Sequence, residues 1–421
     1  MHNAAPDPAS GFGSGSALAC LDEAGRAEYW ASLALRHAKG LGARSIRRLI
    51  GHFGSALAAI KHPDDWPEAT VNRKRSAAIR DESWRADAKP EWEAARTLRG
   101  RIILWTDPLY PPLLRELPDA PIVLYVRGDP ALLRGPCLAV VGKRQCSSEG
   151  VRASAYFARA LAEAGVTIVS GLARGVDQAA HRESVTRAGR TIAVLGTGLD
   201  VPYPAEALPL YEQIATHGLL LSELPPGAPP RPANFPIRNR IISGLALGVL
   251  VVEAAPRSGS LITARLALEQ NRQVFAVPGS IGAPTAQGCQ DLIRQGARPV
   301  FAAHDILLGL SPLLRDIVSD PPPEPAACEP APERKKIPAP AAPVFRRKTP
   351  SPFPPNSPEA RLLAVLTRFG QAVSIDLLDD ALDLSAPELS ALVVRLEVQG
   401  LIRRLPGQYY ALPEVSSRNA Q

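Results

Sequence analysis

The sequence predicts an α/β protein with a doubly wound, mostly parallel sheet, because short apolar segments alternate with helical patterns through the middle of the chain. One segment, residues 248–252, reads GVLVV and has the β-branched content of a strand that is covered on both faces. After it come Glu253 and then Ser258-Gly259-Ser260, which opens a helical pattern where open α/β sheets bind ligands. The predicted strands are residues 101–107, 122–127, 137–141, 167–170, 191–195, 219–222, 248–252 and 273–276.

The composition sets limits on the class of protein. The length of 421 residues predicts two or three domains, and the formal charge of +7 favours a polyanionic partner wherever the cations cluster. Residues 1–22 have no basic segment followed by an apolar core, so we expect a disordered leader. No segment has the apolar length that a bilayer requires, and the five cysteines form no C-x-x-C pair. We therefore expect a cytoplasmic protein without a membrane anchor, a disulfide framework or a zinc site.

Residues 23–100 predict a small helical domain. Between Tyr29 and Pro63 the chain has no acidic residue. Apolar residues at helical spacing, interrupted by Gly40 and Gly42, indicate two short helices joined by a tight turn, as in a helix-hairpin-helix or SAM-like domain. Such hairpins bind nucleic-acid backbone, but a solvated basic helix face has the same composition, and both interpretations stay open. The cations of this segment are Arg36, Lys39, Arg44, Arg47, Arg48 and Lys61.

Residues 101–312 form the predicted sheet domain, and the composition changes sharply after it. Between residues 321 and 358 lie 14 of the chain's 43 prolines, so residues 313–357 are predicted to be a flexible linker. Residues 358–414 return to amphipathic helices and close on a Pro-Gly turn, the pattern of a winged helix, and residues 415–421 are expected to be a disordered tail. This winged helix has eight acidic residues against five arginines, so we expect it to bind a protein partner rather than duplex DNA.

Three strand-to-helix turns have the chemistry of an anion site. Each places glycine, hydroxyl or basic groups at a helix N-terminus, where backbone amides and the helix dipole attract phosphate. None matches a dinucleotide fingerprint or a Walker A loop, so we expect no nucleotide cofactor, and we expect no metal. The predicted phosphate-binding residues are Gly142, Lys143 and Arg144 in the first turn, Ser170, Gly171 and Arg174 in the second, Arg238, Asn239 and Arg240 after Pro236, and Ser258, Gly259 and Ser260 in the third.

Three titratable side chains in this region have more than one interpretation. Asp177 and His181 lie four positions apart and share a helix face. We interpret Asp177 as a group that orients Arg174 or caps the turn, and His181 as a hydrogen-bond partner of a neighbouring loop, rather than as an acid/base or metal pair. Glu253 either pairs with an arginine or acts as a catalytic base.

Several motifs resemble those of a known family: GKR at 142–144, SGLARGVDQAAH at 170–181, FPIRNRIISGL at 235–245 and SGSLITA at 258–264. Over residues 108–310 the chain resembles the DNA-processing protein A (DprA, also called Smf) family. The resemblance implies an extended Rossmann-like domain that binds single-stranded DNA without strong sequence preference, dimerises, and loads the RecA recombinase during natural transformation, without being an enzyme. It implies DNA contacts at Arg144, Ser170, Gly171, Arg174, Arg238 and Arg240. Lys143 and Glu149 depart from the family pattern, which makes the groove mouth more basic and removes one aromatic contact.

Two other functions fit parts of the sequence. A nucleoside-monophosphate glycosidic-bond hydrolase on a related sheet would use Glu253, but SGSLITA lacks the Gly-Gly-x-Gly-Thr loop of such enzymes. A duplex-DNA transcription factor acting through the winged helix is disfavoured by the acidity of that segment. The resemblance and an apolar edge strand at residues 298–301 also predict a homodimer through Leu292 and Ile293.

Overall fold

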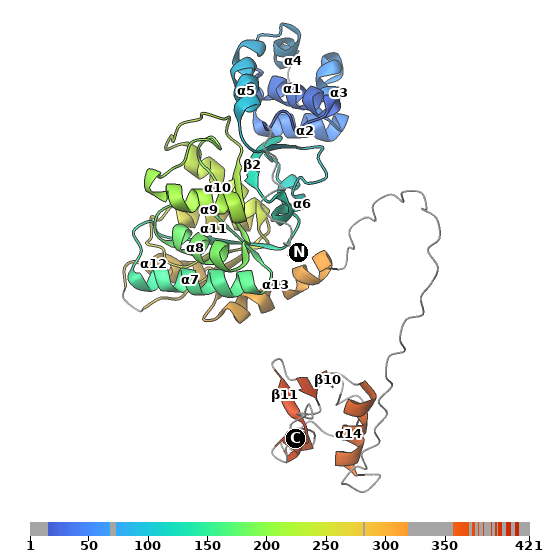
Figure 1. Cartoon of the computed structure of the whole chain (residues 1–421), viewed down its shortest axis with the longest axis vertical. Helices are drawn as coiled ribbons and strands as arrows, with labels where there is room; N and C mark the ends of the chain where they lie inside the picture. Colours follow the sequence, from blue (N-terminus) through green and yellow to red (C-terminus); the bar gives the residue numbers. More distant parts are fainter. Residues whose placement is uncertain are drawn as a thin grey trace, which may run out of the picture. The chain divides into compact units, whose positions relative to one another are not determined.

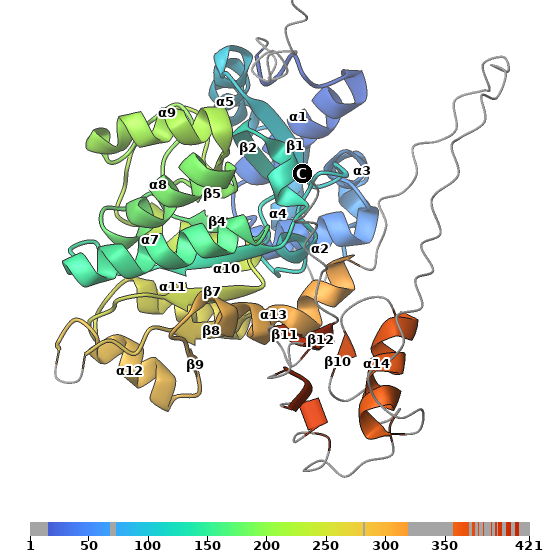
Figure 2. The ribbon, with the colours of Figure 1, turned by 60° about the horizontal axis from the view of Figure 1, so that its bottom comes forward.

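The structure is a computed structural model of the chain (Figure 1, Figure 2). It describes residues 16–67, 73–280, 283–318, 357–369 and short stretches between 373 and 411. The chain divides into two compact units, Met1–Pro325 and Ala326–Gln421. Most of the predicted leader, almost all of the predicted linker and the predicted final tail lie outside the described residues.

The first unit begins with short helices, as the sequence predicts. The first helix begins where the Asp22 carboxylate accepts a hydrogen bond from the Gly25 amide at 2.7 Å. The predicted glycine turn follows it, and Gly40 there has a φ of 81°, which favours glycine. The elements are α1 (Glu23–His37), α2 (Ala43–Phe53), α3 (Ala56–Lys61), η2 (Pro63–Asp65), α4 (Arg73–Arg80) and α5 (Arg85–Thr97).

A buried polar network joins these helices to the sheet. The Glu91 carboxylate on α5 contacts the Arg36 guanidinium, accepts a hydrogen bond from the Tyr125 hydroxyl and lies 2.7 Å from His37 Nε2. Arg36 also donates to the backbone carbonyl of Glu223 at 2.7 Å. The inclusion of Arg36 in a solvated basic face is therefore wrong, because the helical domain packs this side of α1 against the sheet domain.

Replacing Glu91 by glutamine is expected to destabilise the protein at neutral pH much more than in acid. Burial raises the pKa of Glu91, but the Arg36 guanidinium and hydrogen bonds from His37 and Tyr125 outweigh burial and lower the pKa to about 2. Because this value lies below the unfolded value, the carboxylate contributes stability above about pH 4.5 that is lost as the pH falls towards 2; the contribution is about 3 kcal/mol. Urea unfolding at about pH 7 and about pH 3 measures it, and an equal deficit at both would contradict the prediction.

Nine strands of the described residues form one sheet, in the order β1-β2-β6-β5-β4-β3-β7-β8-β9. The pairs from β6 to β9 are parallel, whereas β1 and β2 run antiparallel to their neighbours, which confirms the predicted mostly parallel α/β fold. The strands are β1 (Arg101–Leu104), β2 (Val123–Gly128), β3 (Cys137–Val141), β4 (Thr167–Ser170), β5 (Thr191–Val194), β6 (Leu219–Ser222), β7 (Gly248–Val251), β8 (Gln273–Ala276) and β9 (Arg298–Pro299).

Helices cover both faces of this sheet (Figure 2). Successive side chains of β3 face opposite layers: Leu138 and Val140 pack with α7 and α13, and Ala139 and Val141 pack with α10 and α11. The remaining helical elements of this unit are α6 (Pro112–Arg115), η3 (Pro130–Leu133), α7 (Ser148–Glu163), α8 (Val176–Ala188), η4 (Ala205–Ala207), α9 (Leu208–His217), α10 (Asn234–Leu245), α11 (Ser260–Glu269), α12 (Gln287–Arg294) and α13 (Ala303–Val318).

The order of the strands creates a ligand-binding position. After β3 the chain adds β4, β5 and β6 on one side, and then returns to add β7, β8 and β9 on the other side. The carboxyl ends of β3, β4 and β7 therefore border the reversal point, where open α/β sheets bind their ligands.

The sheet edge at β9 differs from the prediction in one respect. Leu292 on α12 is buried in the core, and Ile293 is half-buried against it, so the expectation of an exposed Leu-Ile pair is wrong. Cys289 and Leu292 lie one helical turn apart and both face inward, which turns the apolar side of α12 towards the sheet. The exposed apolar side chains near this edge are instead Phe301, 77% exposed, and Leu308, 51% exposed.

The second unit has the elements of a winged helix. α14 (Pro358–Phe369) buries Leu362 and Leu366 in a separate apolar core. The strands β10 (Val373–Ser374), β11 (Arg403–Leu405) and β12 (Tyr409–Ala411) form an antiparallel sheet in the order β10-β12-β11.

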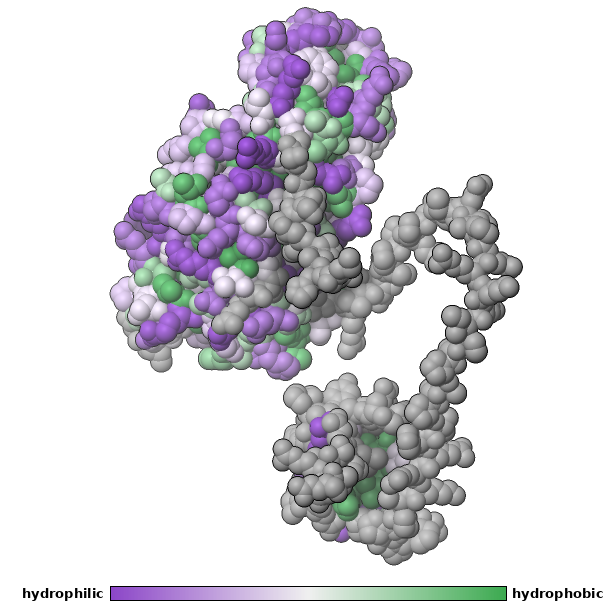
Figure 3. Space-filling model, in the orientation of Figure 1, coloured by the Kyte–Doolittle hydropathy of each residue, from purple (hydrophilic) through white to green (hydrophobic). Residues whose placement is uncertain are grey.

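No helix within the described ranges combines the length and the apolar composition needed to cross a bilayer. On the face of the first unit drawn in Figure 3, hydrophilic residues predominate and hydrophobic ones form small, scattered patches.

Candidate nucleic-acid interface

A groove of about 530 Å³ lies at the carboxyl ends of β3, β4 and β7. Residues from all three predicted turns and from α10 line it, although the turns are far apart in the sequence. Of the predicted site residues, the groove brings together Gly142, Arg144, Arg238, Asn239, Ser258, Gly259 and Ser260. Its lining does not include Lys143, Ser170, Gly171, Arg174 or Arg240.

The first turn supplies an exposed cation. Gly142 allows close packing, because a Cβ there would lie 2.5 Å from a methyl group of Val176. The Lys143 amide donates to the Glu253 carbonyl at 2.8 Å, so this amide is not available to a ligand. Arg144 is exposed, and its guanidinium lies 5.7 Å from the centre of the Phe235 ring.

The second turn is occupied by a side chain of the protein itself. One carboxylate oxygen of Asp177 accepts hydrogen bonds from the amides of Gly171 and Ala173, at 3.1 and 3.4 Å. Burial raises the pKa of Asp177 to about 6, although Arg238 and these amides oppose the shift. Asp177 thus caps the turn, which is one of the two roles that the sequence predicts for it, and it takes the place that a phosphate would need.

The third turn keeps two amides open. No side chain caps α11, and the Leu261 and Ile262 amides donate to the Ser258 and Gly259 carbonyls at 3.1 Å, which leaves the Gly259 and Ser260 amides without a partner among the described residues. Gly259 is exposed, and the Ser258 and Ser260 hydroxyls lie 2.8 Å apart beside it. Of the three turns, this one has the arrangement that best suits an anion.

Arg238 forms the floor of the groove. The side chain is buried, and it donates to the carbonyl of Gly171 at 2.9 Å and to the carbonyl of Val194, which joins the ends of β4 and β5. Burial lowers the pKa of Arg238 to about 10, while Asp177 opposes this shift. Because Arg238 still lines the groove, one guanidinium both holds the strand ends together and faces the ligand position.

Two of the predicted arginine contacts lie outside the groove lining. Arg240 is two positions from Arg238 on α10, so the two side chains leave opposite sides of the helix. The Arg240 guanidinium binds Glu223 at 2.6 and 2.7 Å and lies 3.6 Å from Asp119. Arg174 is exposed and pairs with Glu206. The sequence pattern did not predict a helix that begins at Asn234, and without this helix the two arginines could not be separated.

An aromatic pair completes the groove and was missed by the sequence analysis. The rings of Tyr203 and Phe235 lie 5.4 Å apart, and the Arg238 guanidinium lies 5.9 Å from the centre of the Phe235 ring. Gly196 makes room for this ring, since a Cβ there would lie 2.7 Å from it. The available signal was the position of Phe235 three residues before Arg238 in FPIRNR.

The Glu253 carboxylate stabilises the start of α7. Its carboxylate accepts hydrogen bonds from the Ser147 amide at 3.1 and 3.2 Å and from the Ser147 hydroxyl at 2.7 Å, at the N-terminus of α7. Gly150 is needed beside it, because a Cβ there would lie 2.2 Å from the carboxylate. Glu253 therefore fixes the start of α7 and does not line the groove.

His181 is also internal. Its Nδ1 lies 2.7 Å from the Thr191 hydroxyl, so its partner is the neighbouring strand β5. Burial lowers the pKa of His181 to about 3, so the ring is neutral at physiological pH. In the part of the chain that the structure describes, no group of three His, Cys, Asp or Glu side chains could hold a metal ion.

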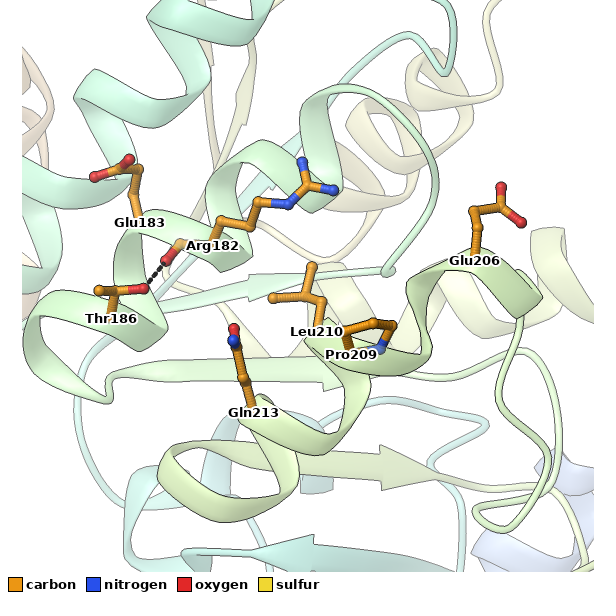
Figure 4. A pocket seen from close by; sticks show the side chains of 7 residues that line it. All are labelled: Arg182, Glu183, Thr186, Glu206, Pro209, Leu210 and Gln213. Atoms are coloured by element: carbon orange, nitrogen blue, oxygen red, sulfur yellow. Dashed lines mark hydrogen bonds between the residues drawn. The ribbon is translucent and has the colours of Figure 1, made fainter.

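A second cavity, of about 520 Å³, lies between α8 and the segment η4–α9 (Figure 4). It mixes Arg182 with the carboxylates Glu183 and Glu206, and it has no aromatic side chain. This mixture of charges suits a nucleic-acid strand less well than the groove does.

Two protein-family models match the chain. The family model for DNA recombination-mediator protein A matches residues 101–311, and the model for the DprA winged helix domain matches residues 346–408. Protein Smf of Synechocystis sp. is 40% identical and covers 72% of this chain and 78% of its own length. DNA processing protein DprA of Streptococcus pneumoniae is 48% identical over 48% of this chain and 71% of its own length.

A solved structure extends this likeness to three dimensions. The X-ray structure of DprA from Streptococcus pneumoniae matches with a TM-score of 0.58 at 36% identity, over 66% of this chain and 97% of that chain. The first family model covers the sheet domain, and the second covers the winged helix. The chain therefore belongs to the DNA recombination-mediator protein A family, whose members are named DprA or Smf.

Proposed function

We propose that the protein binds single-stranded DNA in the groove and loads the RecA recombinase onto that strand. The observation that carries the proposal is the Phe235 ring, which lies beside Tyr203 and within 6 Å of the guanidiniums of Arg144 and Arg238. Aromatic faces that stack on bases, flanked by cations that hold phosphates, are the two components of single-strand binding. RecA loading, in the cytoplasm during DNA uptake and recombination, is what the family resemblance implies.

The ligand contacts of this proposal are fewer than the sequence predicts. Arg144 and Arg238 neutralise phosphates, and the open amides before α11 hold another. Tyr203 and Phe235 stack on bases. Because stacking tolerates any base and the groove has no helix placed to enter a major groove, we expect slight sequence preference and weaker binding of duplex DNA.

A mobility-shift experiment tests this proposal. Binding of an oligothymidylate is compared with binding of a duplex of equal length across a salt series, and RecA filament formation is followed on DNA coated with single-strand-binding protein. We expect tighter binding of the single strand and faster filament formation when the protein is added. Equal binding of the duplex would contradict the groove as a single-strand site. Unchanged filament formation would contradict the loading of RecA but not the binding of DNA in the groove.

Replacing Glu253 by glutamine separates DNA binding from the hydrolase alternative. Because the carboxylate caps α7 outside the groove, we expect binding of oligothymidylate to remain within a few-fold of the parent, with a loss of stability of about 1–3 kcal/mol from the weakened hydrogen bonds. Product analysis with nucleoside monophosphates is the second measurement. Glu253-dependent release of free base would favour the hydrolase.

We also propose a homodimer through the sheet edge at β9. An open edge strand and the exposed Phe301 and Leu308 form a surface that a second copy would cover. Replacing both side chains by glutamate is expected to give a monomer, because a carboxylate buried without a partner opposes association. Light scattering at tens of micromolar measures this. Leu208→Glu, at a position on α9 that is 46% exposed, is the control and should stay dimeric; a monomeric parent would contradict the interface.

The winged helix is proposed to contact a protein partner. Arg395 of this unit is paired with Glu359 of α14 at 3.1 Å. An arginine that is already ion-paired, in a unit with an excess of acidic residues, contributes little to the binding of a phosphate backbone.

A further inference from the structure

Four arginines gather where the helical domain meets the sheet domain: Arg44, Arg47 and Arg48 on α2, and Arg115 at the end of α6. We call them the seam arginines. Arg47 lies over the Trp105 ring, 4.2 Å from its centre, and donates to the Arg115 carbonyl at 3.4 Å. Arg44 and Arg48 are exposed, and Arg44 lies three positions from Arg47 and four from Arg48, so its side chain is adjacent to both on the helix surface. Figure 1 shows α2 on the side of the helical domain that faces β2 and α6.

No carboxylate among the described residues forms an ion pair with the cluster. Within the described ranges, none of the seam arginines forms an ion pair, and the Arg115 guanidinium donates to the carbonyls of Trp105 and Asp107 instead. The Nε atoms of Arg47 and Arg115 are buried without a hydrogen-bond partner. Other arginines of the helical domain do have acidic partners, namely Arg80 with Asp64, Arg85 with Glu82 and Arg96 with Glu93.

This arrangement opposes the stability of the isolated protein. Arg44 and Arg48 are like charges four positions apart, which repel on a helix. Arg44 also lies in the first turn of α2, where the helix dipole is positive and where the sequence has no acidic residue. By contrast, α1 begins with the carboxylate of Asp22, and the first amides of α3 donate to the Glu28 carboxylate at 2.7 and 2.9 Å. An anion bound at the seam arginines would remove the repulsion.

The seam arginines and the groove lie beyond opposite ends of α10. Gly244, near the end of this helix, packs against Leu114 of α6, whereas Phe235, near its start, lines the groove. Along the helix axis this separation is about 14 Å, at 1.5 Å per residue. A strand that leaves the groove must therefore run at least about 14 Å along the molecule to reach the seam arginines.

We propose that the seam arginines are a second phosphate-binding surface, which holds the DNA strand after it leaves the groove. The inference rests on the proposed function, because it extends the path of the same single strand. The surface recognises the sugar–phosphate backbone and not the bases, since it offers guanidiniums while the ring of Trp105 is buried beneath them. The helical domain thereby lengthens the DNA site of the sheet domain.

The test uses the full chain with Arg44→Gln and Arg48→Gln combined, because both side chains are exposed and their loss leaves the core intact. The matched control is Lys89→Gln with Arg96→Gln, which removes the same charge from exposed positions of α5. Binding of oligothymidylates of about 6 and about 30 nucleotides is measured across a salt series; the shorter one fills the groove alone. For the longer strand, the slope of log affinity against log salt should fall by about 1.4, which is about a 25-fold loss at ~0.1 M salt.

The short strand and the control variant should behave like the parent. If the seam variant binds the longer strand with the parent's salt slope, the second surface does not exist. Binding of the short strand would still support the groove as a DNA site. Equal weakening for both lengths also overturns the second surface, since the substitutions would then act on the groove. A parent protein that binds neither length overturns the proposed function itself.

Discussion

Replacing Arg238 by alanine is expected to cause the largest loss of DNA affinity of any single substitution in the groove. The guanidinium lines the ligand position and also holds the ends of β4 and β5 through the carbonyls of Gly171 and Val194. Its loss removes a phosphate contact and loosens the groove floor together. We therefore expect a fall in the salt slope of about 0.7, the value for one phosphate on a single strand, and a further loss of affinity that does not depend on salt.

Arg144→Ala and Arg240→Gln separate these two contributions. Arg144 is exposed and braces no strand, so its removal should lower the salt slope by about 0.7 with little change in stability. Arg240 is buried on the same helix as Arg238, but it is paired with Glu223. Arg240→Gln should therefore destabilise the protein and leave the slope unchanged. A slope for Arg238→Ala equal to that of the parent would contradict the assignment of Arg238 as a phosphate ligand.

The stability of Arg238→Ala should also depend on pH. Removing the Arg238 guanidinium takes away the cation that favours the ionised form of the buried Asp177 carboxylate, so the variant should lose stability near neutral pH. The folded pKa of Asp177 is already raised to about 6, so its contribution to stability is present below the unfolded pKa and is lost as the pH rises through 6. Without Arg238 the pKa rises further, and the deficit of the variant should grow between about pH 6 and pH 8. Urea unfolding at these two values measures it.

The sheet domain could be predicted well from the sequence because its strands are buried on both faces. Such strands appear as short, continuous apolar runs, and the predicted runs for β3, β4, β6 and β8 coincide with the strands of the structure. The winged helix was predictable for a related reason, since its helices are amphipathic. The sequence pattern could not predict that the strand order reverses after β6. Because of this reversal, the turns after β3 and β7 meet in one groove.

The candidate site was predicted less completely, because residue type does not tell whether a charge is already satisfied within the protein. The turn at Gly171 has the composition of a phosphate site, but the Gly171 amide already donates a hydrogen bond to the Asp177 carboxylate. Arg240 and Arg174 were placed with Arg238 for the same reason, although each has its own carboxylate partner. Tyr203 and Phe235 are 32 positions apart in the sequence, and only the fold brings their rings together.

Replacing Phe235 by alanine is expected to weaken DNA binding without changing its dependence on salt. The ring neutralises no phosphate, so its contribution is the stacking of a base, which is about 1–3 kcal/mol, or about 5- to 150-fold in affinity. Phe235→Tyr keeps the stacking face and should retain most of the affinity. The control is Tyr156→Ala, which removes an exposed ring from α7, outside the groove lining.

Fluorescence anisotropy with an oligothymidylate across the same salt series measures both quantities for the Phe235 variants. Parallel lines for parent and Phe235→Ala, displaced in affinity, are the expected result, because counterion release depends on the phosphates alone. A changed slope would mean that the ring acts by positioning Arg144 or Arg238, which lie 5.7 and 5.9 Å from its centre. Coincident lines would mean that no base reaches the ring, and the strand would then have to follow the groove with its bases turned to solvent. A base-stacking groove predicts displaced parallel lines, whereas a groove that holds phosphates alone predicts coincident ones.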